Sequence, residues 1–140
     1  MSARSTKRDD VFYFKLNAHS GVPVYRQLMD QVQGAIAAGR LKSGEQLPTI
    51  RQVAVDLTIN PNTVTRAYRE MEIRGLLETQ QGSGTFIAEQ QAPRDSHHHH
   101  HQLQQLAIET VARAGANGFT LVELIDALNK VGSQKNATRR

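Results

Sequence analysis

Five polar side chains in one short stretch of the chain offer a dense set of hydrogen-bond donors and acceptors. They are Arg51, Asn62, Thr63, Arg66 and Arg69. A guanidinium can bond guanine O6 and N7 together, an amide can pair with adenine, and a threonine can hold a phosphate or touch a thymine methyl. We expect Arg66 to contact a base and Arg51 to position the protein, although either arginine fits the other role.

The residues after Asn60 follow the pattern of a helix with two distinct faces. Asn60 is a favourable N-cap, and Pro61 suits the first turn because its missing N–H would be unpaired there anyway. At about 100° per residue, the apolar and polar side chains fall on opposite sides. The apolar side holds Val64, Ala67, Tyr68 and Met71, and the polar side holds Asn62, Thr63, Arg66, Arg69 and Glu70. One face can pack while the other contacts a partner, although an ordinary solvated helix shows the same periodicity.

A shorter helix is expected just before this one. Thr49 can cap a helix that begins at Ile50, and Pro48 disfavours an earlier start. The inward stripe of this helix is Val53, Ala54 and Leu57. Arg51 lies on the other face near the positive end, where a phosphate could meet the guanidinium and free backbone N–H groups together. A plain surface arginine would look the same.

Two strand-like runs follow at 76–80 and 85–88, and they bracket the tip Gln81-Gly82-Ser83-Gly84. Such a glycine-rich tip suits a β-hairpin. It has no bulky side chain to keep its backbone away from a sugar-phosphate strand. Helix, turn, helix and then hairpin is the order of a winged helix-turn-helix, which predicts operator binding.

The stretch from about Val22 to Ala88 resembles the DNA-binding domain of the GntR family of bacterial transcription regulators. The matching positions are Leu47, Pro48, Thr49, Arg51, Val53, Ala54, Thr63, Val64, Tyr68, Gly75, Leu76, Gly82, Gly84, Thr85 and Phe86. The segments 60–64 and 66–72, with the short stretch after the hairpin, further resemble the YtrA-like subfamily.

The resemblance implies that Arg51, Asn62, Thr63 and Arg66 contact DNA while residues 82–84 follow the minor groove. It also implies a dimer with a short helical C-terminal region. The full set of predicted DNA-binding residues is Thr49, Arg51, Asn62, Thr63, Arg66, Arg69, Gly82, Ser83 and Gly84.

The segments before the motif are expected to support it. Residues 1–10 are predicted to form a mobile arm, and the strand-prone, aromatic run 11–16 to dock on the core. A helix is predicted from Pro23 to near Gly39. Its apolar face is Val24, Leu28, Val32, Ala35 and Ile36. This helix should pack across the helix-turn-helix.

Two amphipathic helices are expected near the C-terminus. The first ends near Gly115, and the second opens with a capping box at Thr120 and Glu123. They are too few to enclose a ligand pocket of the usual 300 Å³ or more. Their apolar stripes must therefore pack on the winged domain or on a second copy, and we predict a homodimer. The predicted dimerisation residues are Leu103, Leu106, Val111, Leu121, Leu124, Ile125 and Leu128.

Five consecutive histidines, His97 to His101, stand in the expected linker at 90–101. Gathered imidazoles could bind a divalent transition metal. On a helix, however, only His97 with His101, or His98 with His101, would share a face. We predict no metal site here, and the remaining interpretations are a solvated helix start or a purification tag.

Composition is compatible with these expectations. The 140 residues carry 17 Lys+Arg against 13 Asp+Glu, a net charge of +4 that suits a nucleic-acid partner. The chain has no cysteine, which excludes disulfides and thiolate sites. No apolar run approaches the roughly 20 residues of a membrane helix, and the N-terminus lacks a hydrophobic leader, so we expect no membrane association and a cytoplasmic location.

The sequence contains no phosphate loop, nucleophile triad or histidine pair with a carboxylate, so we expect neither an enzyme nor a cofactor. A winged helix that binds a protein through Tyr68 and the hairpin is the alternative. Arg51, Asn62 and Arg66 disfavour it, because protein-binding faces more often expose aromatic or aliphatic anchors.

The expected fold is mainly α with a small β-hairpin: a winged helix-turn-helix domain at 11–89, a linker, and a two-helix dimerisation segment with a flexible tail at 102–140. The expected function is transcription regulation, by repression, at a palindromic operator bound as a homodimer. A small effector between the C-terminal helices stays an open alternative.

Overall fold

The computed structural model describes residues 12–90 and 96–133. The chain divides into two compact units, and the boundary lies between Gln90 and Gln91. The mobile arm expected at 1–10 and the tail expected at the C-terminus lie outside the described residues.

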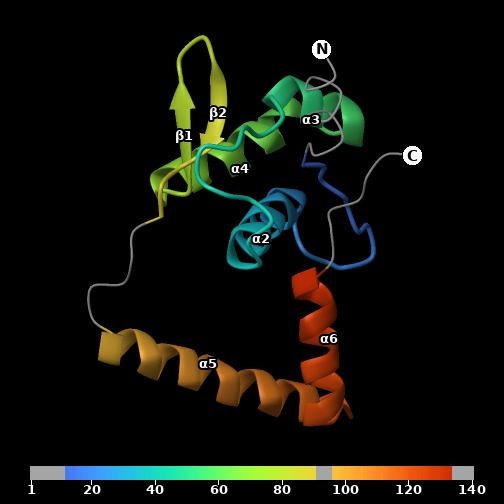
Figure 1. The fold of residues 1–140 in the computed structure, drawn as a ribbon. Helices are drawn as coiled ribbons and strands as arrows, with labels where there is room; N and C mark the ends of the chain where they lie inside the picture. Colours follow the sequence, from blue (N-terminus) through green and yellow to red (C-terminus); the bar gives the residue numbers. More distant parts are fainter. Residues whose placement is uncertain (1–11, 91–95, 134–140) are drawn as a thin grey trace, which may run out of the picture. The chain divides into compact units, whose positions relative to one another are not determined.

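Three helices and a β-hairpin form the described part of the first unit (Figure 1). They are α2 (Val24–Ala37), α3 (Ile50–Leu57), α4 (Pro61–Ile73), β1 (Leu77–Gln80) and β2 (Gly84–Ile87). Helix α4 packs on both α2 and α3 and also contacts β1. Leu28 of α2 and Val64 and Met71 of α4 are completely buried, so the core lies against α4. The predicted winged helix-turn-helix is confirmed.

Side-chain caps define where the two helices of the motif begin. Thr49 Oγ1 accepts from the Gln52 N–H at 3.0 Å, and Asn60 Oδ1 accepts from the Asn62 N–H at 2.8 Å. Both caps were predicted. Between the helices, Thr58 closes α3 in the left-handed conformation with φ 55°. This residue turns the chain sharply, so that α4 can begin three residues later.

The hairpin of β1 and β2, which we call the wing, has more backbone hydrogen bonds than a two-stranded hairpin alone would have. Strands β1 and β2 are antiparallel, with Leu77 opposite Ile87 and Gln80 opposite Gly84. The segment before α3 adds to the free edge of β2. There the Leu47 N–H donates to the Thr85 carbonyl at 2.9 Å and the Ile87 N–H donates to the Glu45 carbonyl at 2.8 Å. The wing is therefore tied to the entrance of the helix-turn-helix.

The aromatic segment before α2 docks on the core as predicted, but it is not a strand. Phe12 and Phe14 are buried, with ring centroids 4.9 Å apart in an edge-to-face arrangement. The Lys15 N–H donates to Gln31 Oε1 at 2.9 Å, and Gln31 Nε2 donates to the Lys15 carbonyl. The side chain of Gln31 on α2 thus satisfies backbone groups that a neighbouring strand would otherwise pair, because no strand lies beside this segment among the described residues.

Two helices, α5 (Ser96–Ala116) and α6 (Leu121–Ser133), form the described part of the second unit. The predicted capping box is present: the Thr120 N–H donates to Glu123 Oε2 at 2.8 Å, and the Glu123 N–H donates to Thr120 Oγ1 at 3.2 Å. Neither helix contains a buried residue. In the described ranges, no helix has the length and apolar character needed to cross a bilayer.

The histidine run lies at the exposed start of α5, which begins at Ser96, and this is the solvated helix start given above as one interpretation of the run. His97 to His101 therefore form the first turns of this helix rather than part of a linker that extends to 101. The run contains neither glycine nor proline, and histidine has an ordinary helix propensity, so a helix started by the downstream residues can extend through it.

Candidate DNA-binding surface

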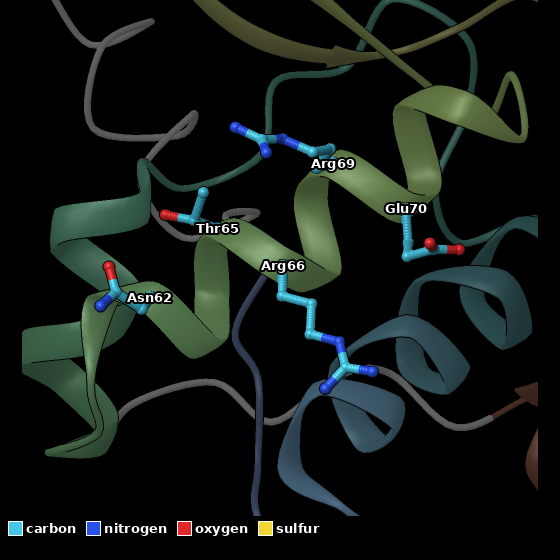
Figure 2. A pocket seen from close by; sticks show the side chains of 5 residues that line it. All are labelled: Asn62, Thr65, Arg66, Arg69 and Glu70. Carbon is cyan, nitrogen blue, oxygen red and sulfur yellow. The ribbon is translucent and has the colours of Figure 1, made fainter.

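The exposed face of α4 carries a shallow groove of about 380 Å³. The residues that line it are Asn62, Thr65, Arg66, Arg69 and Glu70 (Figure 2). The structure thus brings together Asn62, Arg66 and Arg69, as predicted. The predicted Thr63 is half-buried and lies outside this lining. The sequence analysis did not include Thr65 among the site residues, because no sequence pattern distinguishes it from other threonines on a helix.

The two arginines of the groove point to different sides. Figure 2 shows Arg66 reaching toward α2, whereas Arg69 extends on the other side of α4. The guanidinium carbon of Arg66 lies 3.8 Å from the ring centroid of Tyr25, in the first turn of α2. This is well within the range of a cation–π contact. Sequence reasoning missed Tyr25. The periodicity predicts the helix that contains Tyr25 but does not show which residue of another helix contacts its ring.

Positive charge on this surface is not neutralised internally. Ion pairs among the described residues include Arg26–Asp30, Arg74–Glu70 and Lys130–Asp126. Arg51, Arg66 and Arg69 are exposed and take part in none of them. Glu70 lies four residues after Arg66, yet its carboxylate is 3.7 Å from Arg74 Nε. The three arginines can therefore offer their donors to an external anion such as a DNA phosphate.

Arg51 occupies the first turn of α3, beside a second groove of about 470 Å³. Its lining is largely apolar and includes Ile50, Val55, Ile59 and Pro61. Thr49 is exposed, and its hydroxyl oxygen accepts from the Gln52 N–H. The cap leaves the Thr49 O–H as a donor, which suits a phosphate oxygen.

The wing tip has a backbone conformation that favours glycine. Gly82 has φ 81° and Gly84 has φ 129°. Gln46 Nε2 donates to the Ser83 carbonyl at 3.0 Å, and a Cβ on Gly84 would collide with the same Gln46 amide. Gln46 thus braces the tip, a role that sequence reasoning missed because Gln46 and Ser83 lie far apart in the chain.

Most of the predicted dimerisation residues are exposed on the second unit. Leu103, Leu106, Leu121, Ile125 and Leu128 are each at least half exposed, Val111 is 40% exposed, and Leu124 is partly buried. In the described part of the chain, no group of three or more His, Cys, Asp or Glu side chains could hold a metal ion.

Residues 24–87 match the family model of bacterial regulatory proteins of the gntR family. The chain is 39% identical over 75 residues to the HTH-type transcriptional repressor YtrA of Bacillus subtilis, covering 54% of this chain and 58% of that protein. It is 44% identical over 70 residues to the uncharacterized HTH-type transcriptional regulator YhcF of the same organism, covering 50% and 58%. The chain thus spans somewhat over half the length of these curated relatives.

Solved structures extend the similarity over more of the chain. A transcriptional antiterminator from Listeria monocytogenes has a TM-score of 0.66 at 28% identity, covering 91% of this chain and 97% of the other. YtrA from Sulfolobus acidocaldarius, a GntR-family transcription factor, has a TM-score of 0.51 at 29% identity, covering 89% and 100%. These relatives are named as a repressor, regulators and an antiterminator of transcription, and none of them is named as an enzyme. Residues 24–87 are therefore a GntR-family helix-turn-helix domain, and YtrA-type regulators are among the proteins to which the chain is similar.

Proposed function

We propose that this protein is a cytoplasmic, sequence-specific repressor that binds a palindromic operator as a homodimer. The observation that carries the proposal is the set of exposed arginines on the helix-turn-helix without ion-pair partners among the described residues. In this proposal α4 enters the major groove, and the backbone of residues 82–84 approaches the neighbouring minor groove. Arg51 and Thr49 bind phosphates at the start of α3.

In this proposal the homodimer forms through α5 and α6. Apolar side chains that are half exposed on two adjacent helices favour burial against a second surface. A two-fold axis through such an interface would present two copies of α4 to the two halves of a palindrome. Packing of these helices on the winged domain of the same chain is the alternative, and it predicts a monomer in solution.

The experiment that tests this function is selection of bound sequences from a random duplex library with the purified protein at moderate salt. We expect enrichment of one motif with two-fold symmetry. A single unpaired half-site would contradict the homodimer, and uniform, strongly salt-dependent binding would contradict sequence specificity. If no duplex binds, the winged helix would be a protein-interaction module. Placing the selected site across a promoter in a transcription assay then separates repression from activation.

A further inference from the structure

Tyr25 and Arg66 form a contact between two helices that the proposed function leaves unexplained. Tyr25 is half-buried and packs against the hydrophobic core, so its ring is held in place. The exposed guanidinium of Arg66 lies over this ring at 3.8 Å. An aromatic face attracts a cation at this range. The contact therefore restrains a long side chain that would otherwise sample many rotamers.

The restraint moves Arg66 away from the centre of the exposed face of α4. Counting about 100° per residue from Asn62, Arg69 falls about 20° to one side and Arg66 about 40° to the other. The stack then draws the guanidinium further toward α2, as Figure 2 shows. The buried residues of α4 centre about 190° from Asn62, so Asn62 lies near the middle of the opposite face, and Arg66 and Arg69 each lie about 30° from that middle, on opposite sides.

Stacking occupies the face of the guanidinium and leaves its edge available. The five N–H donors of arginine lie in the plane of the group. Neither an ion pair nor a hydrogen bond engages the Arg66 edge in the described parts of the chain. Glu70 would be the usual partner four residues along the helix, but its carboxylate is directed to Arg74. The edge of Arg66 is thus ordered and open to an anion.

The first turn of α2 adds to the attraction for an anion at this place. Pro23 occupies the N-cap and provides no side-chain hydrogen bond to the helix. The N–H groups of the first turn and the positive end of the helix dipole therefore stand near Tyr25, which is the second residue of α2.

We infer that Tyr25 is a positioning residue for DNA binding: it holds the Arg66 guanidinium beside α2 to bind a backbone phosphate, leaving Asn62, near the middle of the exposed face, to contact the bases. This inference rests on the proposed function. It assigns Arg66 a phosphate rather than the base expected from its side-chain chemistry alone, and it gives α2 a part in DNA binding.

The stack itself is tested by NMR on the free, full-length protein, without DNA. The ring current of Tyr25 should shift the Arg66 side-chain protons upfield. The shift should persist in Tyr25→Phe, which keeps the aromatic face, and disappear in Tyr25→Leu, which keeps an apolar side chain. Arg66 protons at ordinary positions in the wild-type protein would overturn the inference.

The role in binding is tested with a double-mutant cycle on the selected operator and on an unrelated duplex. We expect Arg66→Ala to weaken both complexes and to reduce the slope of log K against log salt by about one. Tyr25→Leu should weaken both by about two- to thirty-fold, the range of a cation–π contact, while Tyr25→Phe binds like the wild type. In the Arg66→Ala background, Tyr25→Leu should have no further effect.

Two results would overturn the inference while leaving the proposed function intact. The first is an equal loss from Tyr25→Leu in both backgrounds, which would mean that Tyr25 acts independently of Arg66. The second is a loss from Arg66→Ala confined to the operator, which would mean that Arg66 contacts a base. Thermal unfolding of each variant excludes a loss of fold. A wild-type protein that binds no duplex would instead contradict the proposed function, and the phosphate role with it, whatever the NMR result.

Discussion

The hydroxyl of Tyr68 donates a hydrogen bond to the carbonyl of Pro48 at 2.5 Å. Tyr68 lies in the middle of α4 and is 2% exposed, while Pro48 directly precedes the cap of α3. The bond therefore ties the middle of α4 to the residue before the N-cap of α3. Burial of the hydroxyl raises the pKa of Tyr68 well above its ordinary value.

Replacing Tyr68 by phenylalanine should destabilise the first unit without opening a large cavity. The ring still fills its place in the core, but the Pro48 carbonyl loses its donor. An unpaired, partly buried acceptor costs about 1–3 kcal/mol. We expect the free energy of unfolding in urea to fall by about this amount, with an unchanged m-value. Equal stability of Tyr68→Phe and wild type would show that water replaces the donor.

The raised pKa of Tyr68 also predicts a loss of stability in alkali. The folded protein keeps the phenol protonated, whereas the unfolded chain releases the proton above a pKa of 10.0. The stabilisation is therefore fully present below pH 10 and declines as pH rises through and beyond that value. Urea titrations between about pH 8 and pH 11 should show a steeper decline for wild type than for Tyr68→Phe. The difference between the two curves removes the contributions of the other tyrosines and of the lysines.

Much of the fold can be predicted from residues that are neighbours in the sequence, whereas much of the candidate site depends on residues that are far apart in the sequence. Thr49 and Asn60 cap helices through residues two or three positions away, so residue type and spacing suffice to predict both helix starts. Tyr25 and Gln46 act through Arg66 and Ser83, which lie far along the chain and carry no shared periodicity. Such roles depend on tertiary packing and become visible in the structure alone.

The contact between Gln46 and the wing tip predicts that a methyl group added at Gly84 weakens DNA binding. Gly84→Ala places a Cβ against the Gln46 amide and also imposes φ 129° on a residue that disfavours it. We expect weaker binding to every duplex, measured by fluorescence anisotropy, because the tip must shift.

Two further variants distinguish backbone strain from steric collision as the reason for weaker binding by Gly84→Ala. At Gly82 an added Cβ meets nothing within 4 Å, so Gly82→Ala reports backbone strain without a collision. Combining Gly84→Ala with Gln46→Ala should restore part of the binding, since the colliding amide is gone. If the double variant is no better than Gly84→Ala, strain rather than the collision displaces the tip.

The apolar stripe of α6 predicts which substitutions would disrupt the proposed homodimer. Leu124→Asp together with Leu128→Asp places two charges on the stripe, and burying them without partners would cost far more than the interface gains. We expect a monomer in sedimentation velocity experiments. Val122 is 76% exposed and lies off this stripe, so Val122→Asp is the matched control and should remain dimeric. A dimer that survives the double substitution would place the interface elsewhere.

Glu70 is the acidic residue among the five that line the groove on α4, and its replacement by a neutral residue should strengthen DNA binding. Its carboxylate lines the groove with Arg66 and Arg69, where it would repel a phosphate. Two unit charges near each other in water interact by about 1 kcal/mol or less, so Glu70→Gln should raise affinity for any duplex by up to about five-fold. The gain should shrink as salt shortens the screening length. Glu109→Gln makes the same charge change on α5 and should have a smaller effect; equal gains from both variants would show that net charge, rather than position in the groove, is responsible.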